Sequence, residues 1–306
     1  MFGKVALTYD NEKLQDGYFA QLQRILAIYS IARKFRFDYV HSPIIDIIIT
    51  QLDDHQTESK IGKFLKIANL NLVTPKNCDL KQFNLIKNIE IPTLFDLVKL
   101  KVFSLLTAKS ILVRITNPYK IIEKRTSIYR FASEIISIDK PSISKSNQIV
   151  AHIRRGISIE HISPGENFSR MLEEDYYIKV LSKICVDNKQ KYKLLILTDA
   201  PESDQYYKPI LKDELKWNQY STYHSEKGIK ISGHKFESIK NFFPGEVEIH
   251  RGGDLIEAWK SMASASHFIM SRSSMSYVGA IANSSGKIYY PPRFWHKPLK
   301  NWVRIS

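Results

Sequence analysis

The stretch that decides the fold is IVAHIRRG, residues 149–156. Residues 149–153 are apolar except for His152, and a short apolar run of this kind is typical of a buried strand. The run leads directly into two arginines and a glycine. Because ligands of parallel sheets bind at the carboxyl ends of the strands, this loop is the first place to look for a site.

Arg154 and Arg155 indicate the chemistry of such a site. A guanidinium is a planar fork of donors that matches phosphate oxygens, so two of them can hold a diphosphate and neutralise its charge. Gly156 lets the backbone turn closely around that ligand. Two adjacent arginines at a strand end can equally be solvated surface residues, and the dipeptide alone leaves both interpretations open.

Outward from this stretch, apolar runs alternate with helical patterns through the second half of the chain. The expected strands cover residues 149–153, 194–197, 247–249, 267–270 and 287–290. The expected helices cover residues 172–184, 255–265 and 275–282. Short strands separated by helices predict a parallel sheet covered on both faces, which is an α/β fold.

The first half is also mixed α/β. Its expected elements are a helix over residues 17–36, a strand over 37–41, a helix over 93–105, a strand over 110–115 and a helix that begins at Asn117. Thr93 is the expected N-cap of the second of these helices.

A polar stretch separates the two halves. Residues 139–147 contain one proline and three serines, a composition whose backbone is easily solvated. A chain of 306 residues is long for one packed core and comfortable for two. We therefore predict two domains, residues 1–145 and residues 146–306.

The composition excludes several classes of protein. Hydrophobic residues make up 43% and charged residues 25%, so neither a disordered nor a fibrous chain is indicated. Cys78 and Cys185 lie far apart without a C-x-x-C spacing, which argues against a disulfide framework or a zinc site. No apolar run approaches the length of a membrane span, and no signal peptide is evident. A cytoplasmic protein is expected.

Residues 152–156 resemble the H-x-R-R-x-D motif of the α-1,2 and α-1,6 fucosyltransferases, which contacts GDP-fucose in the donor-binding domain of those enzymes. This sequence has Ile157 where the family has Asp, and Glu160 is close enough to be a replacement carboxylate.

Three other segments resemble the same family. Residues 269–277, IMSRSSMSY, are similar to its Ser-rich stretch, where backbone N–H groups at a helix start suit a phosphate; the serines can also simply cap the helix. Residues 197–199 resemble a strand end whose Asp reads the guanine ring, although such an Asp is also a common turn former. Residues 16–24 look like a degenerate G-x-G-N-Q segment, or an ordinary capped amphipathic helix.

The resemblance implies a GT-B-like fold, with two Rossmann-type domains that face each other across a cleft. The first domain would lie on the acceptor side, and the second would bind the donor. The implied reaction is the inverting transfer of fucose, or a similar sugar, from GDP to a glycan hydroxyl. No metal or other cofactor is expected, because the arginines would stabilise the departing diphosphate and no D-x-D triplet is present.

The candidate site residues follow from these motifs. The candidate catalytic residues are Arg154, Arg155, His152, Asp16 and Glu160, of which the last two are the candidate bases. The candidate donor-binding residues are Gly17, Gln21, Arg24, Gly156, Asp199, Asp254, Ser273, Ser274 and Ser276. Asp254 is expected to cap a helix first and to contact the donor second.

The net charge of +14 attracts polyanions, phosphorylated ligands or an anionic membrane surface. A nucleic-acid-binding module would use this charge, but the cations are dispersed and no RNP, helix-turn-helix or zinc-finger pattern is present. A glycosyltransferase that uses another nucleotide sugar is a further possibility. An NAD-linked oxidoreductase on a similar scaffold has no support here, because no G-x-G-x-x-G opens a helix.

We expect a nucleotide-sugar donor, no nucleic acid, and a glycan or lipid-linked glycan acceptor. Such an acceptor suits bacterial surface polysaccharide synthesis with peripheral contact at the inner membrane face.

Overall fold

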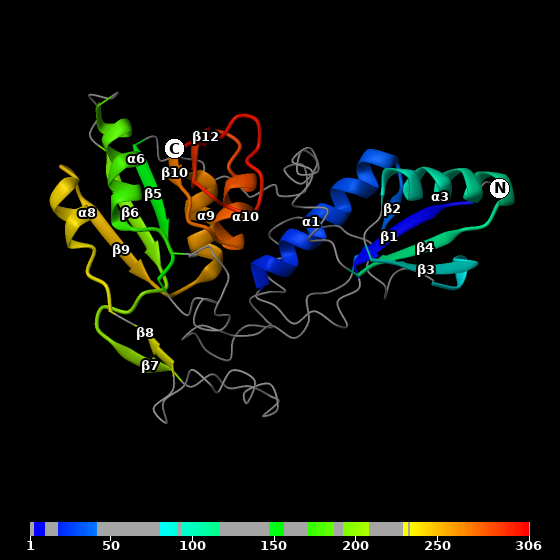
Figure 1. Cartoon of the computed structure of the whole chain (residues 1–306), viewed down its shortest axis with the longest axis horizontal. Helices are drawn as coiled ribbons and strands as arrows, with labels where there is room; N and C mark the ends of the chain where they lie inside the picture. The colour runs from blue at the N-terminus through cyan, green and yellow to red at the C-terminus, as the bar shows by residue number, and fades with distance from the viewer. Residues whose placement is uncertain are drawn as a thin grey trace. The chain divides into compact units, whose positions relative to one another are not determined.

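The structure is a computed structural model, and the described residues form two compact units (Figure 1). The described ranges are 3–9, 18–41, 80–90, 93–116, 147–155, 171–186, 192–207, 229–231 and 233–305. Of these, residues between 3 and 116 and residues 295–300 belong to the first unit. Residues between 147 and 294 and residues 301–305 belong to the second.

The second unit is built on a six-stranded sheet in which every neighbouring pair of strands is parallel. Its strands are β5 (Gln148–Ile153), β6 (Lys193–Thr198), β9 (Val247–Arg251), β10 (His267–Ile269), β11 (Lys287–Tyr290) and β12 (Val303–Arg304). Its helices are α6 (Glu174–Val186), α8 (Glu237–Phe242), α9 (Leu255–Ser264) and α10 (Ser274–Ala282). Strands β7 (Gln205–Tyr207) and β8 (Ile229–Ile231) form a separate antiparallel pair.

The strand order of this sheet is β12-β11-β10-β5-β6-β9. The chain starts at β5, proceeds through β6 to β9 at one edge, and then returns to β10 on the other side of β5. From there it continues outward to β11 and β12. This is the doubly wound order of the Rossmann fold, and its topological switch point lies between β5 and β10. The carboxyl ends of these two strands therefore border the crevice in which such sheets bind ligands.

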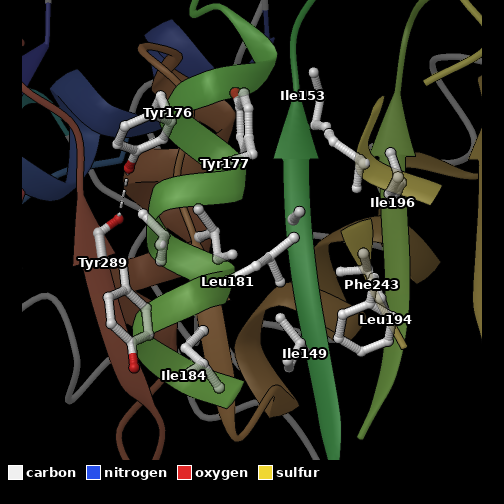
Figure 2. Packing of buried hydrophobic residues seen from close by; sticks show 14 of the residues in the cluster. Ile149, Ile153, Tyr176, Tyr177, Leu181, Ile184, Leu194, Ile196, Phe243 and Tyr289 are labelled. Atoms are coloured by element: carbon white, nitrogen blue, oxygen red, sulfur yellow. Dashed lines mark hydrogen bonds between the residues drawn. The ribbon is translucent and has the colours of Figure 1, made fainter. Parts of the chain in front are cut away.

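Helix α6 covers the core of the second unit. Figure 2 shows Tyr177, Leu181 and Ile184 of α6 packed over β5 and β6. All three side chains are fully buried, or nearly so. Burial of each such Leu or Ile side chain stabilises the fold by about 1.5–3 kcal/mol. The hydroxyl of Tyr176 also donates to the carbonyl oxygen of Tyr289 at 3.4 Å, which links α6 to β11.

Asn283, directly after α10, fixes that helix against its neighbour α9. Its Nδ2 donates to the carbonyl oxygens of Met262 at 2.9 Å and Ala265 at 2.8 Å, where α9 ends. Its Oδ1 accepts from the backbone N–H of Gly286 at 2.7 Å. One buried amide thus holds the end of α9, the end of α10 and the turn before β11 together.

The first unit has a four-stranded parallel sheet in the order β2-β1-β4-β3. Its elements are β1 (Val5–Tyr9), α1 (Tyr18–Phe35), β2 (Asp38–Tyr39), the short 3-10 helix η1 (Leu80–Gln82), β3 (Leu85–Ile89), α3 (Leu94–Thr107) and β4 (Ile111–Ile115). Thr93 caps α3: its hydroxyl accepts from the N–H of Asp96 at 3.1 Å, and the Asp96 carboxylate accepts from the N–H of Thr93 at 3.0 Å.

The predicted α/β class with parallel sheets flanked by helices is confirmed, and each expected strand and helix of the second half is present within a few residues. The helices predicted over residues 17–36 and 93–105 are α1 and α3. The helix predicted from Asn117 and the boundary between residues 145 and 146 lie outside the described residues. The arrangement of the two domains across a cleft stays a prediction.

Within the described ranges, each helix is too short or too polar to cross a lipid bilayer.

Replacement of Asn283 by alanine should lower the free energy of unfolding of the second unit by about 2–4 kcal/mol. The substitution leaves buried carbonyl and N–H groups without partners, and each such group costs about 1–3 kcal/mol. Urea unfolding followed by circular dichroism measures the change. Ser285→Ala is the matched control, because the Ser285 side chain is exposed. Equal stability of the two variants would contradict the role given to Asn283.

Candidate functional site

The arginine pair follows β5 at the switch point. Arg154 and Arg155 are both half-buried. The backbone N–H of Arg155 donates to Asp199 Oδ1 at 2.7 Å, and Asp199 directly follows the neighbouring strand β6. Arg155 Nη1 donates to the carbonyl oxygen of Arg154 at 3.1 Å. The pair is thus held at the sheet edge by a carboxylate for which the sequence pattern had suggested donor recognition.

Arg154 carries a buried donor that the structure leaves open. Its Nε is shielded from solvent and has no hydrogen-bond partner in the described part of the chain. A buried N–H without an acceptor costs about 1–3 kcal/mol. A phosphate oxygen is the kind of acceptor that a guanidinium N–H binds most strongly. The orphaned donor therefore fits an anionic ligand at this position.

A buried hydrogen-bonded cluster crosses the switch point beside the arginines. His152 Nδ1 lies 2.6 Å from Ser276 Oγ and 3.2 Å from Ser271 Oγ. The two serine oxygens are 3.0 Å apart, and the N–H of Ser271 donates to Ser276 Oγ at 3.1 Å. All three side chains are buried. The cluster joins the end of β5 to the loop after β10 and to the first turn of α10.

Burial determines the charge of His152. The pKa of its imidazole is lowered from 6.5 to about 4, chiefly by desolvation; the Asp199 carboxylate opposes this shift, and the Arg154 guanidinium adds to it. The ring is therefore neutral at pH 7 and can exchange hydrogen bonds with hydroxyl groups without placing a cation in the core. Arg154 and Arg155 supply positive charge at this site instead.

Helix α10 brings its amino terminus to the same place. Ser273 is the N-cap, and its hydroxyl accepts from the N–H of Met275 at 3.2 Å. Ser274 opens the helix, and Ser276 in the first turn contacts His152. The amino end of a helix carries a partial positive charge that favours anions. This placement is compatible with both roles predicted for these serines, the capping of the helix and the binding of a phosphate.

The corner between β9 and α9 lies at the edge of the sheet, because β9 is separated from β5 by β6. Gly252 and Gly253 have φ of 64° and 88°, values at which a side chain is strained. The N–H of Gly252 donates to the carbonyl oxygen of Thr198 at 2.9 Å. Asp254 caps α9 by accepting from the N–H of Ile256 at 2.8 Å, as the sequence predicted. Its second predicted role, donor contact, stays a prediction.

The predicted residues of the first half belong to the first unit. Gln21 and Arg24 are buried in α1, and Arg24 Nη1 donates to the hydroxyl of Tyr9 at 3.0 Å. That bond ties α1 to the carboxyl end of β1. Asp16, Gly17, Gly156 and Glu160 lie outside the described residues.

Two residues of the site were not among the sequence-predicted site residues. Ser271 completes the cluster around His152, and the serine pattern after β10 was the signal that could have identified it. Tyr177 on α6 donates its hydroxyl to the carbonyl oxygen of His152 at 3.2 Å. A tyrosine in an amphipathic helix gives no such signal, because its contact depends on the packing of α6 over β5.

In the described part of the chain, no group of three or more His, Cys, Asp or Glu side chains is placed to hold a metal ion. The side chains that converge on the switch point are cations, hydroxyls, one neutral imidazole and one carboxylate, Asp199, which is bonded to the backbone N–H of Arg155; this set suits an anionic ligand better than a cation.

No protein-family model and no curated protein matches this sequence. Among solved structures, the chain is similar to POFUT1 in complex with GDP, with 10% identity over 94% of this chain and 98% of that chain and a TM-score of 0.49. POFUT1 in complex with GDP-fucose gives 8% identity over 100% and 98%, with a TM-score of 0.48. The ADP-heptose LPS heptosyltransferase II of E. coli gives 9% identity over 99% and 90%, with a TM-score of 0.36.

Replacement of His152 by asparagine should reduce the loss of stability on acidification. The imidazole pKa is about 4 in the folded protein and about 6.5 in the unfolded chain. The stability that the neutral ring contributes is therefore complete above pH 6.5 and is lost as the pH falls toward 4. At pH 5 this loss amounts to about 2 kcal/mol. Urea unfolding at pH 7 and pH 5 measures it.

The wild type should therefore lose about 2 kcal/mol more than the His152→Asn variant between these two pH values. Ser285→Ala, at an exposed residue that does not titrate in this range, serves as the control and should behave like the wild type. Identical pH dependence of His152→Asn and the wild type would show that the ring is not held neutral by burial.

Proposed function

We propose that this protein is a metal-independent, inverting glycosyltransferase of the GT-B type. Its second unit binds the diphosphate of a nucleotide-sugar donor at the switch point between β5 and β10. The observation that carries the proposal is the convergence of Arg154, Arg155 and the amino end of α10 on the crevice where a sheet of this strand order binds ligands.

The contacts of the described residues support a diphosphate as the ligand. Two guanidiniums at half-buried positions supply positive charge, and the Arg154 Nε is a buried donor in need of an acceptor. The first N–H groups of α10 supply further donors on the neighbouring loop. A diphosphate has enough oxygens to accept from both sources at once.

In the proposed reaction, the acceptor hydroxyl attacks the anomeric carbon from the face opposite the diphosphate. The bond from the anomeric carbon to the phosphate oxygen breaks, and its electron pair leaves with the nucleoside diphosphate. Arg154 and Arg155 stabilise the charge that develops on this leaving group. Electrostatic stabilisation of this kind is usually the largest contribution to such catalysis. The acceptor proton passes to a carboxylate, for which Asp16 and Glu160 are the candidates.

His152 has a positioning role in this proposal. Its neutral ring is engaged with Ser271 and Ser276, so it orients the loop and the first turn of α10 rather than the sugar. The proposed donor is GDP-fucose or a related GDP-sugar, and the proposed acceptor is a glycan hydroxyl in bacterial surface polysaccharide synthesis. Gln21 and Arg24 of the first unit are proposed to bind the donor, together with Asp199 and Asp254 of the second.

Replacement of both arginines, Arg154→Ala with Arg155→Ala, should weaken binding of GDP by about 100-fold or more. Charge-assisted hydrogen bonds contribute about 1.5–3 kcal/mol each, and the double variant removes two cations from the diphosphate. Isothermal titration calorimetry of GDP at fixed salt measures the change. Arg304→Ala is the matched control, because it removes an exposed guanidinium at β12, the strand at the far edge of the same sheet.

Thermal-shift measurements with GDP, UDP, CDP and ADP identify the donor class, since a ligand that binds the folded state raises its apparent stability. GDP should stabilise the protein most. A preference for another nucleotide would change the donor but keep the reaction class. Unchanged GDP affinity and turnover in a correctly folded double arginine variant would falsify the proposed function.

A further inference from the structure

Helix α3 of the first unit carries large apolar residues on more than one of its faces, yet only one of these faces is buried. Leu97, Leu100 and Ser104 are buried against the rest of the first unit. A helix that is hydrophobic all round is normally buried all round, because exposed apolar surface is unfavourable in water. The opposite face of α3 therefore needs an explanation.

The exposed face carries large apolar side chains. Leu106 is 81% exposed and Phe95 is 65% exposed, and Val102 lies between them at the spacing that places all three along one line of the helix. The further exposed apolar residues of α3 are Val98, Phe103 and Leu105. We call Phe95, Val98, Val102, Phe103, Leu105 and Leu106 the α3 outer face. Strand β3, which precedes α3, also exposes Leu85 and Ile86. An exposed apolar helix face of this kind marks an interaction site.

The charges of the segment that contains the outer face select its partner. Residues 80–116 contain six Lys or Arg against two Asp or Glu, a net charge of +4. Lys99 Nζ lies 4.1 Å from the centroid of the Phe95 ring, so a cation is in contact with the most exposed aromatic side chain. Lys87 on β3 is exposed, and so is Lys109, which follows the C-cap residue of α3. One of the two carboxylates, Asp96, is engaged in the cap with Thr93.

Large apolar side chains interleaved with lysines match the boundary between lipid headgroups and acyl chains. In that environment the apolar side chains enter the acyl region and the amines contact lipid phosphates. A second copy of this chain would instead bring two faces of the same positive charge together, which repel each other. We infer that the α3 outer face docks the first unit onto a bilayer that contains anionic lipids.

The docking face is formed before it meets a membrane. The capping box of Thr93 and Asp96 holds the first turn of α3, and Ala108 closes the helix with a left-handed φ of 54°. Lys101 Nζ donates to the carbonyl oxygen of Phe35 at 2.9 Å, which fixes α3 to the end of α1. Binding therefore requires no helix formation, and little conformational entropy is lost when the face is covered.

Vesicle sedimentation tests this inference on the full-length protein. The wild type should bind vesicles of ~30% phosphatidylglycerol in phosphatidylcholine at ~0.1 M salt, and should bind pure phosphatidylcholine vesicles much more weakly. The double substitution Phe95→Gln with Leu106→Gln should lower the partition coefficient by about 30-fold or more. Lys99→Glu should lower it by about tenfold or more, because reversal changes two charges near the lipid surface.

Two matched controls separate the outer face from general surface properties. Phe242→Gln removes an aromatic side chain that is 40% exposed in the second unit, and Lys235→Glu reverses an exposed lysine there. Both should bind vesicles like the wild type. Circular dichroism establishes that every variant is folded, and GDP-induced thermal stabilisation, which depends on residues other than the substituted ones, should be unchanged in all of them. Membrane docking and the proposed donor binding can thus fail independently.

Three outcomes would overturn the inference. The first is equal vesicle binding by the wild type and the Phe95→Gln, Leu106→Gln variant. The second is equal binding of the wild type to anionic and neutral vesicles. The third is a dimer in sedimentation velocity that this double substitution converts to a monomer, without vesicle binding by the wild type, because it would assign the outer face to a second copy of the chain.

Discussion

The hydrogen bonds between His152, Ser271 and Ser276 are the interaction on which the site of the second unit depends. They join the end of β5 to the segment that follows its neighbour β10. These parts are far apart in the sequence, since His152 and Ser276 are separated by 124 residues. A buried polar cluster of this kind is favourable only when every member has a partner, so its geometry tolerates little displacement. The loop after β10 and the first turn of α10 are consequently held in register with the end of β5.

At this site the structural role and the positive charge belong to different residues. Burial keeps the pKa of His152 low, and a neutral ring can fix the backbone without repelling a neighbouring guanidinium. The arginines are half-buried and remain available to a ligand, while Asp199 is bonded to the backbone of Arg155. The carboxylate thus positions the arginine loop in addition to any role in reading a base. The sequence pattern had suggested that this Asp either reads a base or forms an ordinary turn.

Much of the second unit could be predicted because its signals are local. The strand before His152, the helix capped by Asp254 and the serines before α10 follow from short patterns that the structure confirms. Strand β1 was not predicted, although its five buried residues form a short run like the one by which β5 was recognised. Strand β3 is exposed along most of its length and lacks the alternation of a half-buried strand. The contact of Tyr177 with His152 depends on tertiary packing, which no local pattern records.

The two units show opposite relations between sequence pattern and environment. In the second, most large apolar residues are buried, and the polar side chains of His152, Ser271 and Ser276 that enter the core are bonded to one another. In the first, α3 is more apolar than one covered face requires. Local preference and burial agree in the second unit and disagree along one face of α3. Such disagreement is expected where a surface has a function outside the folded chain, because stability alone would favour polar residues there. In the two proposals, the same +14 charge draws a diphosphate to the arginines and anionic lipid to that face, so one electrostatic property of the chain would serve both surfaces.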